Sequence, residues 1–327
     1  MTVVLEDLCV SIAGHRLVDG VCLALAPGER TALVGASGAG KSLTCAALAG
    51  TLPLGAAVTG RLTVRSADRP TPPGDDDGVN LLAMPAARRP AAGRIALVQQ
   101  DPSTSLHPLE TVGAQVAAAA RAAGASRWRA RSRAVELLGR VGLETDLAER
   151  VPARLSGGQR QRAAVALALA CEPRLILADE PTTALDVVAR AELLAVLVEV
   201  TGPRAEGTDG EDPAAPAAPA LLLVTHDLPA AGACERLIVL DEGRVVESGD
   251  ARSVLTRPRH AVTRAMCEAA REESLAGAVA AIESRAALDD CALCEITQDG
   301  PGDKQRRGAR VPVGAGAAPS DSGTSGE

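Results

Sequence analysis

The sequence predicts an α/β protein that combines a parallel sheet, an antiparallel β layer and a block of helices. Residues 175–178 and 221–225 are uniformly apolar, which is typical of parallel strands buried on both faces. Residues 30–49 have the pattern of a short apolar strand, a glycine-rich turn and a helix. Residues 3–10 and 21–25 alternate between apolar and polar side chains, which predicts the antiparallel layer.

The helical block is predicted from two stretches with helical periodicity. Residues 111–142 form the first stretch and residues 157–171 form the second. A further helix over residues 187–200 lies between the two uniformly apolar strands. Strands that alternate with helices in this order indicate an α/β core.

Composition favours a chain that folds by ordinary burial in a reducing compartment. No apolar run reaches the roughly 20 residues of a membrane-spanning helix, and the first ten residues carry acids where a secretory signal needs basic residues. The eight cysteines are mostly scattered singly and suggest no disulfide framework. We therefore expect a soluble, cytoplasmic protein.

Charge argues against a nucleic-acid partner. The net charge is −7, which disfavours a surface dominated by phosphate-backbone contacts. One local exception is the basic run from Arg127 to Arg133 around Trp128, which could contact nucleic acid or lipid. We expect a solvated helix face instead, because the chain has no second aromatic side chain on which bases could stack.

A glycine-rich loop with the spacing of a phosphate-binding loop lies between the predicted strand at 30–34 and the helix at 42–49. Its glycines let backbone N–H groups surround β and γ phosphates, its lysine supplies a cation, and its serine hydroxyl can bind Mg²⁺. The residues expected to bind nucleotide here are Gly35, Ala36, Ser37, Gly38, Ala39, Gly40, Lys41, Ser42 and the adjoining Leu43.

Two adjacent acids end the apolar strand at 175–178. Asp179 and Glu180 are therefore expected at the carboxyl edge of the sheet, beside the phosphates. Asp179 is suited to hold Mg²⁺ through its water shell, and Glu180 is suited to polarise an attacking water as a general base.

A second anion site is predicted at the start of the helix over residues 157–171. Ser156 and the backbone N–H groups of Gly157 and Gly158 form a helix start of the kind that binds anions, and Gln159 completes the sequence LSGGQ. One nucleotide cannot easily reach two separate anion sites of one chain. Head-to-tail pairing of two chains solves this, because the loop of one closes on the nucleotide of the other.

The order of these motifs resembles that of the ABC ATPases over about residues 1–265. The resemblance covers the phosphate loop, Gln100, the LSGGQ sequence, the strand that ends in Glu180, the sequence Ala184-Leu185-Asp186 and His226. It implies a RecA-like P-loop NTPase core with an antiparallel β subdomain and an α-helical signature subdomain. It also implies ATP as substrate, Mg²⁺ as cofactor and hydrolysis coupled to transport.

The same resemblance assigns three further roles. Gln100 matches the residue that senses Mg²⁺ and the attacking water, with Gln99 as the alternative. His226 matches the switch histidine that contacts the γ phosphate, and Asp186 matches the acid that contacts the partner cassette. Ile12 lies where these ATPases usually place an aromatic residue that stacks on adenine. Because the chain has no Phe or Tyr, we expect weaker discrimination of ATP from GTP.

A narrower resemblance links the chain to the ATPases of oligopeptide, dipeptide and nickel importers. It rests on the stretch from Gln100 to Pro108 followed by Thr111, and on the stretch from Pro258 to Arg264. His107 stands where that subfamily has Asn, and Ala261 and Val262 replace Pro and Tyr. The cysteine-rich C-terminal segment of the subfamily is not clearly present, because Cys291 and Cys294 offer two thiols, with Cys267 as a third, where metal sites need four ligands.

These inferences give one nucleotide-binding domain over residues 1–265, with its helical subdomain at about 104–172 and insertions at about 66–78 and 201–219. A helical extension over residues 266–296 and a disordered tail over 297–327 follow.

The expected partners are integral-membrane permease subunits and a second ABC ATPase, identical or different. An extracytoplasmic solute-binding protein is expected to act through the permease, and the chain is expected at the cytoplasmic face of the cell membrane. The alternatives are an exporter or drug-resistance ATPase, and an ABC protein that acts on ribosomes or DNA.

Overall fold

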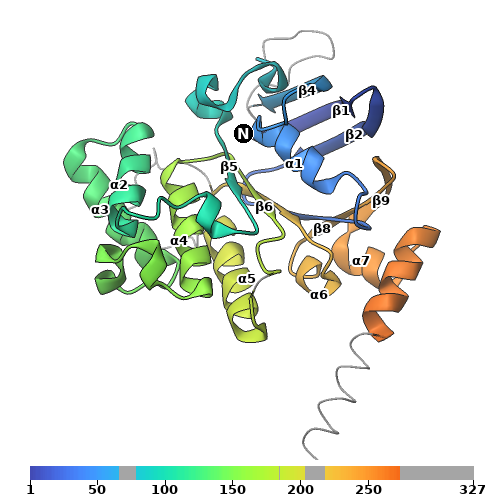
Figure 1. Ribbon diagram of the computed structural model, residues 1–327. Helices are drawn as coiled ribbons and strands as arrows, with labels where there is room; N and C mark the ends of the chain where they lie inside the picture. The colour runs from blue at the N-terminus through green and yellow to red at the C-terminus, as the bar shows by residue number, and fades with distance from the viewer. Residues whose placement is uncertain (66–78, 184, 203–217, 273–327) are drawn as a thin grey trace, which may run out of the picture. The chain divides into compact units, whose positions relative to one another are not determined.

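The computed structural model describes residues 1–65, 79–183, 185–202 and 218–272, and they form a small antiparallel sheet, a larger mixed sheet and a group of helices (Figure 1). The predicted excursion at 66–78, most of the predicted insertion at 201–219 and the C-terminal tail lie outside the described residues.

The antiparallel layer consists of three strands in the order β2-β1-β4, with bounds Thr2–Ile12 for β1, His15–Leu25 for β2 and Ala56–Arg65 for β4. A two-residue turn joins β1 to β2, and both of its residues, Ala13 and Gly14, have positive φ. Such turns match the natural twist of a β-hairpin. The predicted layer is therefore present, and β4 extends it by one strand.

The larger sheet has the strand order β5-β6-β7-β3-β8-β9, in which only the β8–β9 pair is antiparallel. Parallel strands are joined by connections that cross over a face of the sheet, and these connections cover the sheet on both sides. The strands are β3 Arg30–Val34, β5 Ile95–Val98, β6 Leu175–Asp179, β7 Ala220–Val224, β8 Arg236–Asp241 and β9 Arg244–Asp250.

Successive residues of the central strands point into two different apolar cores. Ile176 and Leu221 belong to one core, which also contains the buried residues of α2 to α5. Leu177 and Leu222 belong to the other, which also contains β1, β2 and α1. This alternation explains why these strands are apolar at every position.

Most of the helices begin at a side chain that accepts a backbone N–H bond, whereas α1 begins at Gly40 without such a cap. Thr111, Ser126, Ser156 and Asp186 cap α2, α3, α4 and α5 in this way, and capping satisfies N–H groups that otherwise have no helical partner. The helices are α1 Lys41–Ala49, α2 Val112–Ala122, α3 Arg127–Arg140, α4 Gly157–Ala170, α5 Val187–Thr201, α6 Leu228–Ala231 and α7 Ala251–Thr256, with residues 261–272 also helical. Short 3₁₀ turns lie at Leu81–Ala83, Ala86–Arg88, Ala91–Gly93, Pro102–Thr104, Thr145–Glu149 and Pro152–Arg154.

The helical block shares its core with the larger sheet. Helices α2 and α3 pack on α4, and α4 in turn contacts β5 (Figure 1). Buried side chains of α3 such as Leu137 and strand residues such as Val98 lie in one continuous apolar cluster. The block is therefore fastened to the edge of the sheet that β5 forms.

The main differences from the sequence-based expectations lie at the ends of elements and at the sheet edges. Strands β4, β5, β8 and β9 are absent from those expectations. Helix α5 runs to Thr201, one residue into the predicted insertion, and the Thr201 side chain is buried with its hydroxyl donating to the Leu197 carbonyl.

We predict that Leu177→Ala lowers the free energy of unfolding by about 2–5 kcal/mol, because Leu177 is fully buried in the centre of β6 and its removal leaves a cavity. Leu54→Ala is the matched control, since the Leu54 side chain is exposed and its loss should change stability by less than about 0.5 kcal/mol. Urea unfolding of both variants measures the difference. Equal effects of the two substitutions would contradict the buried position of β6.

Candidate functional site

The carboxyl ends of four parallel strands meet at one edge of the larger sheet. Val98 of β5 pairs with Ala178 of β6, Asp179 pairs with Val224 of β7, and Leu33 of β3 also pairs with Val224. The segments that follow these strands therefore start side by side. They carry the two glutamines 99 and 100, the acids 179 and 180, His226 and the glycine-rich loop.

The glycine-rich loop, residues 35–40, connects β3 directly to α1. Gly35 packs so tightly that a side-chain carbon there would lie 2.2 Å from the Leu240 carbonyl oxygen. Gly40 has φ 101°, and a side-chain carbon there would lie 3.0 Å from the Leu17 carbonyl oxygen. The loop conformation therefore requires glycine at both positions.

The remaining residues of the loop region divide between solvent and core. Ala36, Ser37 and Gly38 are exposed, whereas Ala39 is buried in the same apolar core as α1, and Leu43 packs against that core. The Ala39 N–H donates to the Ala36 carbonyl at 3.1 Å, so the middle of the loop forms a tight turn at the surface.

Lys41 is the buried cation of the site. Its side chain is 7% exposed, and its ammonium donates to the carbonyl oxygens of Gly35 and Ala36 at 2.8 and 2.9 Å. Burial lowers the pKa of Lys41, and the nearby carboxylates of Glu180 and Asp179 oppose this shift. The loop thus holds a positive charge where phosphate oxygens would be placed.

Asp179 and Ser42 face each other across the strand ends. The Ser42 hydroxyl donates to Asp179 Oδ1 at 3.3 Å. Burial raises the pKa of Asp179 and the neighbouring Glu180 adds to the shift, while Ser42 and Lys41 oppose it. A hydroxyl beside a carboxylate is an all-oxygen donor set of the kind that Mg²⁺ prefers, so these residues fit that ion.

Glu180 is held in an uncommon backbone conformation. Its φ is +46°, and its N–H donates to the Val224 carbonyl at 2.9 Å. The carboxylate lies 3.3 Å from Nδ1 of His226 and accepts a bond from Thr183 at 3.1 Å. A non-glycine residue in left-handed backbone is costly and is concentrated at functional sites. The structure therefore places the predicted general base directly beside the histidine predicted to contact the γ phosphate.

Ser156 begins α4 with a complete capping box. Its hydroxyl accepts from the Gln159 N–H at 3.2 Å, and the Gln159 side chain accepts from the Ser156 N–H at 3.0 Å. Ser156, Gly157 and Gly158 line a hollow together with Asp186, and all of its lining residues come from segments 156–162 and 185–192. Exposed Val187 and Val188 lie in the second of these segments.

The two glutamines after β5 have different surroundings. Gln99 is tied into the helical block, because its carbonyl accepts from the Gln161 side chain at 2.9 Å and its side chain accepts from Thr104 at 2.5 Å. Gln100 is exposed and follows directly. The structure thus links this segment to α4, and leaves Gln100 facing solvent.

Ile12 lies at the tip of the β1–β2 hairpin, directly opposite His15. Residues that pair directly across two strands share a face of the sheet, so Ile12 and His15 lie on one face. The register shifts between the pairs Ser11–Arg16 and Val10–Val18, and Leu17 is the extra residue at this shift. The carbonyl of Leu17 reaches Gly40 of the phosphate loop. The approach of Leu17 to the phosphate loop was missed from the sequence, because it depends on the register of the hairpin.

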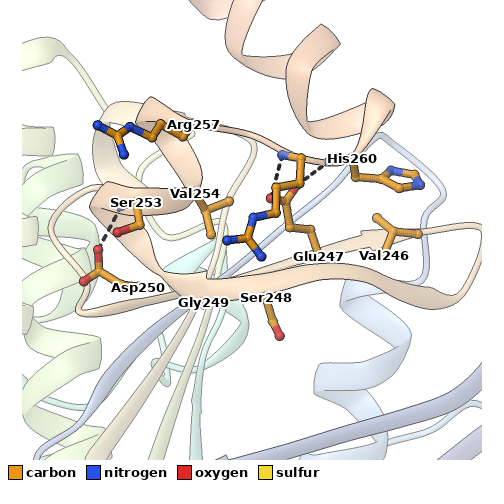
Figure 2. A pocket seen from close by; sticks show the side chains of 10 residues that line it. Val246, Glu247, Ser248, Gly249, Asp250, Ser253, Val254, Arg257 and His260 are labelled. Atoms are coloured by element: carbon orange, nitrogen blue, oxygen red, sulfur yellow. Dashed lines mark hydrogen bonds between the residues drawn. The ribbon is translucent and has the colours of Figure 1, made fainter.

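A second hollow lies between β9, α7 and the start of the helix at 261–272 (Figure 2). Its acids already have partners: Glu247 accepts from the N–H groups of Arg259 and His260 at 2.8 and 2.9 Å, and Asp250 caps α7 by accepting from Ser253. These bonds secure the segment from 258 to 264 that resembles the peptide-importer ATPases. We assign this hollow a structural role.

Of the three cysteines considered for a metal site, Cys267 alone lies within the described residues. Cys267 is buried in the core, and no cluster of three or more metal-binding side chains occurs in the described part of the chain. Cys291 and Cys294 lie outside the described residues.

We predict that Asp179→Asn raises the free energy of unfolding of the nucleotide-free protein at pH 7. A carboxyl whose pKa is higher in the folded than in the unfolded state destabilises the fold once pH passes its unfolded pKa, and the amide removes this loss. The gain should shrink as pH falls toward about 4, the ordinary range of an aspartate. Asp186→Asn is the control, because Asn caps a helix as well as Asp does. A loss of stability in Asp179→Asn at pH 7 would contradict the electrostatic account.

Comparison with known proteins agrees with this geometry. The family model described as ABC transporter matches residues 18–183. The dipeptide transport ATP-binding protein DppD of Escherichia coli (strain K12) is 36% identical over 266 residues, which cover 80% of this chain and 74% of that protein. The putative peptide import ATP-binding protein BMEII0863 of Brucella melitensis is 39% identical over 254 residues, covering 75% and 69%.

Solved structures agree as well. The structure of cbiO1 from Clostridium perfringens, described as part of the ABC transporter complex cbiONQ, matches with a TM-score of 0.59 at 25% identity and covers 78% of this chain and 90% of that one. The cassette MJ0796, in a dimeric post-hydrolysis state bound to ADP and Pi, matches with a TM-score of 0.58 at 28% identity and covers 76% and 99%. The chain belongs to the ABC transporter family, as one of its ATP-binding and ATP-hydrolysing subunits.

Proposed function

We propose that the chain drives import of peptides or similar small solutes by hydrolysing ATP at the carboxyl edge of its sheet. The observation that carries this proposal is the convergence of Lys41, Asp179, Glu180 and His226 at or after the ends of three neighbouring strands, β3, β6 and β7. The peptide and dipeptide transport proteins among its relatives support the class of solute.

In this proposal the loop from Gly35 to Ser42 binds the phosphates of ATP, and Leu43 anchors the loop to the core. The bound Mg²⁺ would be held by Ser42, Asp179 and Gln100, and it would neutralise charge on the β and γ phosphates. Lys41, already buried and held by the carbonyls of Gly35 and Ala36, would supply the remaining positive charge without having to be ordered during the reaction.

Glu180 acts as the general base that takes a proton from the attacking water. Its carboxylate lies 3.3 Å from His226, which orients it and contacts the γ phosphate in the proposed role. In phosphoryl transfer the protein mainly positions groups and stabilises charge, so no covalent intermediate is required. The strained backbone at Glu180 fixes the direction of this carboxylate before substrate arrives.

The site is completed by a second cassette. Ser156 and the N–H groups of Gly157 and Gly158 form an anion site whose lining residues are separate from the phosphate loop. Head-to-tail pairing would place this anion site on the ATP of the partner, with Asp186 at the contact. Exposed Val187 and Val188 beside the hollow are apolar surface that pairing would cover.

Transport requires a separate permease. In the described residues no helix is both long and apolar enough to cross a bilayer. The proposed location is the cytoplasmic face of the membrane, where the segment after Gln100 and the helical block grip the permease. A solute-binding protein outside the cell would deliver the solute, as the importer class implies.

Two alternatives remain distinguishable by experiment. An exporter ATPase would use the same site, and the direction of solute movement in vesicles that contain the permease separates it from an importer. A non-transport ABC protein would bind ribosomes or DNA, and failure to copurify with a permease would favour that class.

We predict that Glu180→Gln lowers ATP turnover by at least about a hundredfold, because general-base catalysis contributes roughly that much, while ATP binding persists. Gel filtration in ATP and Mg²⁺ should then show a dimer that wild-type protein forms only transiently. Thr183→Val is the matched control, since it removes a neighbour of Glu180 and leaves the base in place. Unchanged turnover in Glu180→Gln would overturn the assignment of Glu180.

A further prediction concerns adenine. Ile12→Tyr should tighten ATP binding by roughly 2- to 10-fold, because an aromatic contact adds about 0.5–1.5 kcal/mol, and should increase the preference for ATP over GTP. Titration calorimetry with both nucleotides measures the change, with Leu109→Tyr as the control on an exposed residue outside the antiparallel layer. A wild-type affinity for GTP already tenfold below that for ATP would contradict the expectation of weak base discrimination.

A further inference from the structure

An exposed tryptophan lies on α3. Trp128 is the single tryptophan of a sequence without Phe or Tyr, and it is 77% exposed. Val135, seven residues later on the same helix, is 50% exposed. Residues spaced three, four or seven apart share a helix face, so Trp128, Arg131 and Val135 form one stripe on the solvent side of α3.

The opposite face of α3 explains this orientation. Ala130, Ala134, Leu137 and Leu138 are buried against α2 and α4 in the main core. They fix the rotation of the helix and leave the stripe outside. In Figure 1, α3 lies with α2 on the side of α4 that faces away from the larger sheet.

Three arginines of this helix have no acidic partner. Arg127, Arg129 and Arg131 are exposed and make no ion pair or side-chain hydrogen bond within the described part of the chain, whereas Arg133 is paired with Glu136. The first turn of α3 also lacks any acidic residue. Cations near a helix start are unfavourable because they face the positive end of the helix dipole. Stability therefore does not explain this basic cluster.

We propose that the stripe Trp128–Arg131–Val135, together with Arg127 and Arg129, binds the anionic headgroups of a lipid bilayer. Tryptophan prefers the boundary between headgroups and acyl chains, and arginines near a bilayer are attracted to its negative surface. The other charges of the chain sum to a net negative value, so they are repelled by the same surface. This surface would therefore turn the helical block toward the membrane.

A lipid surface fits these residues better than a protein or nucleic-acid partner does. A stable protein interface buries about 800 Å² on each side around an apolar centre, and the stripe offers two apolar side chains. Single-stranded nucleic acid needs several aromatic side chains for stacking, and the chain has one. Interfacial binding to lipid needs only an anchor and several cations.

The proposal rests on the proposed function in one respect, because a permease would bring the chain to the membrane. The test uses the purified chain alone, so lipid binding and ATP-driven transport are measured separately. Trp128 is itself the probe, since no other tryptophan contributes to the fluorescence. The protein is titrated with phosphatidylcholine vesicles that contain about a third phosphatidylglycerol, chosen because the anionic lipid supplies the attraction.

We expect a blue shift of Trp128 emission with anionic vesicles, quenching by brominated acyl chains, and loss of both in about 0.5 M salt, where charge interactions are screened. The triple substitution Arg127→Gln, Arg129→Gln and Arg131→Gln should weaken binding by up to about a hundredfold, at roughly fivefold per arginine. Gln forms helices as well as Arg does, so circular dichroism and ATPase activity should be unchanged.

The matched control removes the same charge elsewhere, from the exposed Arg252, Arg257 and Arg271, and should bind vesicles as the wild type does. Sedimentation with vesicles provides the readout for Trp128→Gln, which should also bind weakly. If the control triple variant lost as much vesicle binding, net charge alone would explain the attraction, and the proposal would be overturned. So would a fluorescence shift with single-stranded RNA but none with vesicles.

Discussion

The site depends on the carboxyl ends of parallel strands that are buried on both faces. Strands β3, β5, β6 and β7 are parallel neighbours, and their carboxyl ends are aligned at one edge of the sheet. The segments that follow these strands therefore lie close together in space, although they are far apart in the sequence. The apolar cores on each side of the sheet hold these strands in place. Every other feature of the site, from the buried lysine to the strained glutamate, follows from this edge.

Three residues of the site adopt states that are unfavourable in the folded chain: Lys41 and Asp179 are buried ionisable groups, and Glu180 has a left-handed backbone conformation. Burial lowers the pKa of Lys41 and raises that of Asp179, so each group is less readily charged than in water. Glu180 adopts left-handed backbone although it is not glycine. Such costs are tolerated at binding sites, and in the proposed function a phosphate chain with its metal ion would supply charges that compensate them. The proposed function thus implies that the folded chain is organised for its substrate before the substrate binds.

Sequence reasoning was most successful where one element has one strong pattern. The strand at Arg30–Val34, the helix starting at Gly157 and the apolar strands β6 and β7 were predicted within a residue or two. Strand β5 is only four residues long and β4 is half exposed, so neither gives a clear periodicity, and both are defined by their partners. The contacts of Glu180 with His226 and of Ser42 with Asp179 join distant segments, and only the fold brings them together. The face shared by Ile12 and His15 depends on a hairpin register that local sequence does not encode.

The central claim is that each ATP site takes its phosphate loop from one chain and its LSGGQ sequence from another. Mixing two inactive variants tests it most directly: Lys41→Ala lacks the lysine of the loop, and Ser156→Arg blocks the anion site at α4. A mixed dimer contains one site in which both parts are intact. The account predicts that mixing restores ATP hydrolysis to about a quarter of the wild-type level, because half of the dimers are mixed and each has one working site of two. Mixtures that stay as inactive as the separate variants would contradict pairing between copies of this chain.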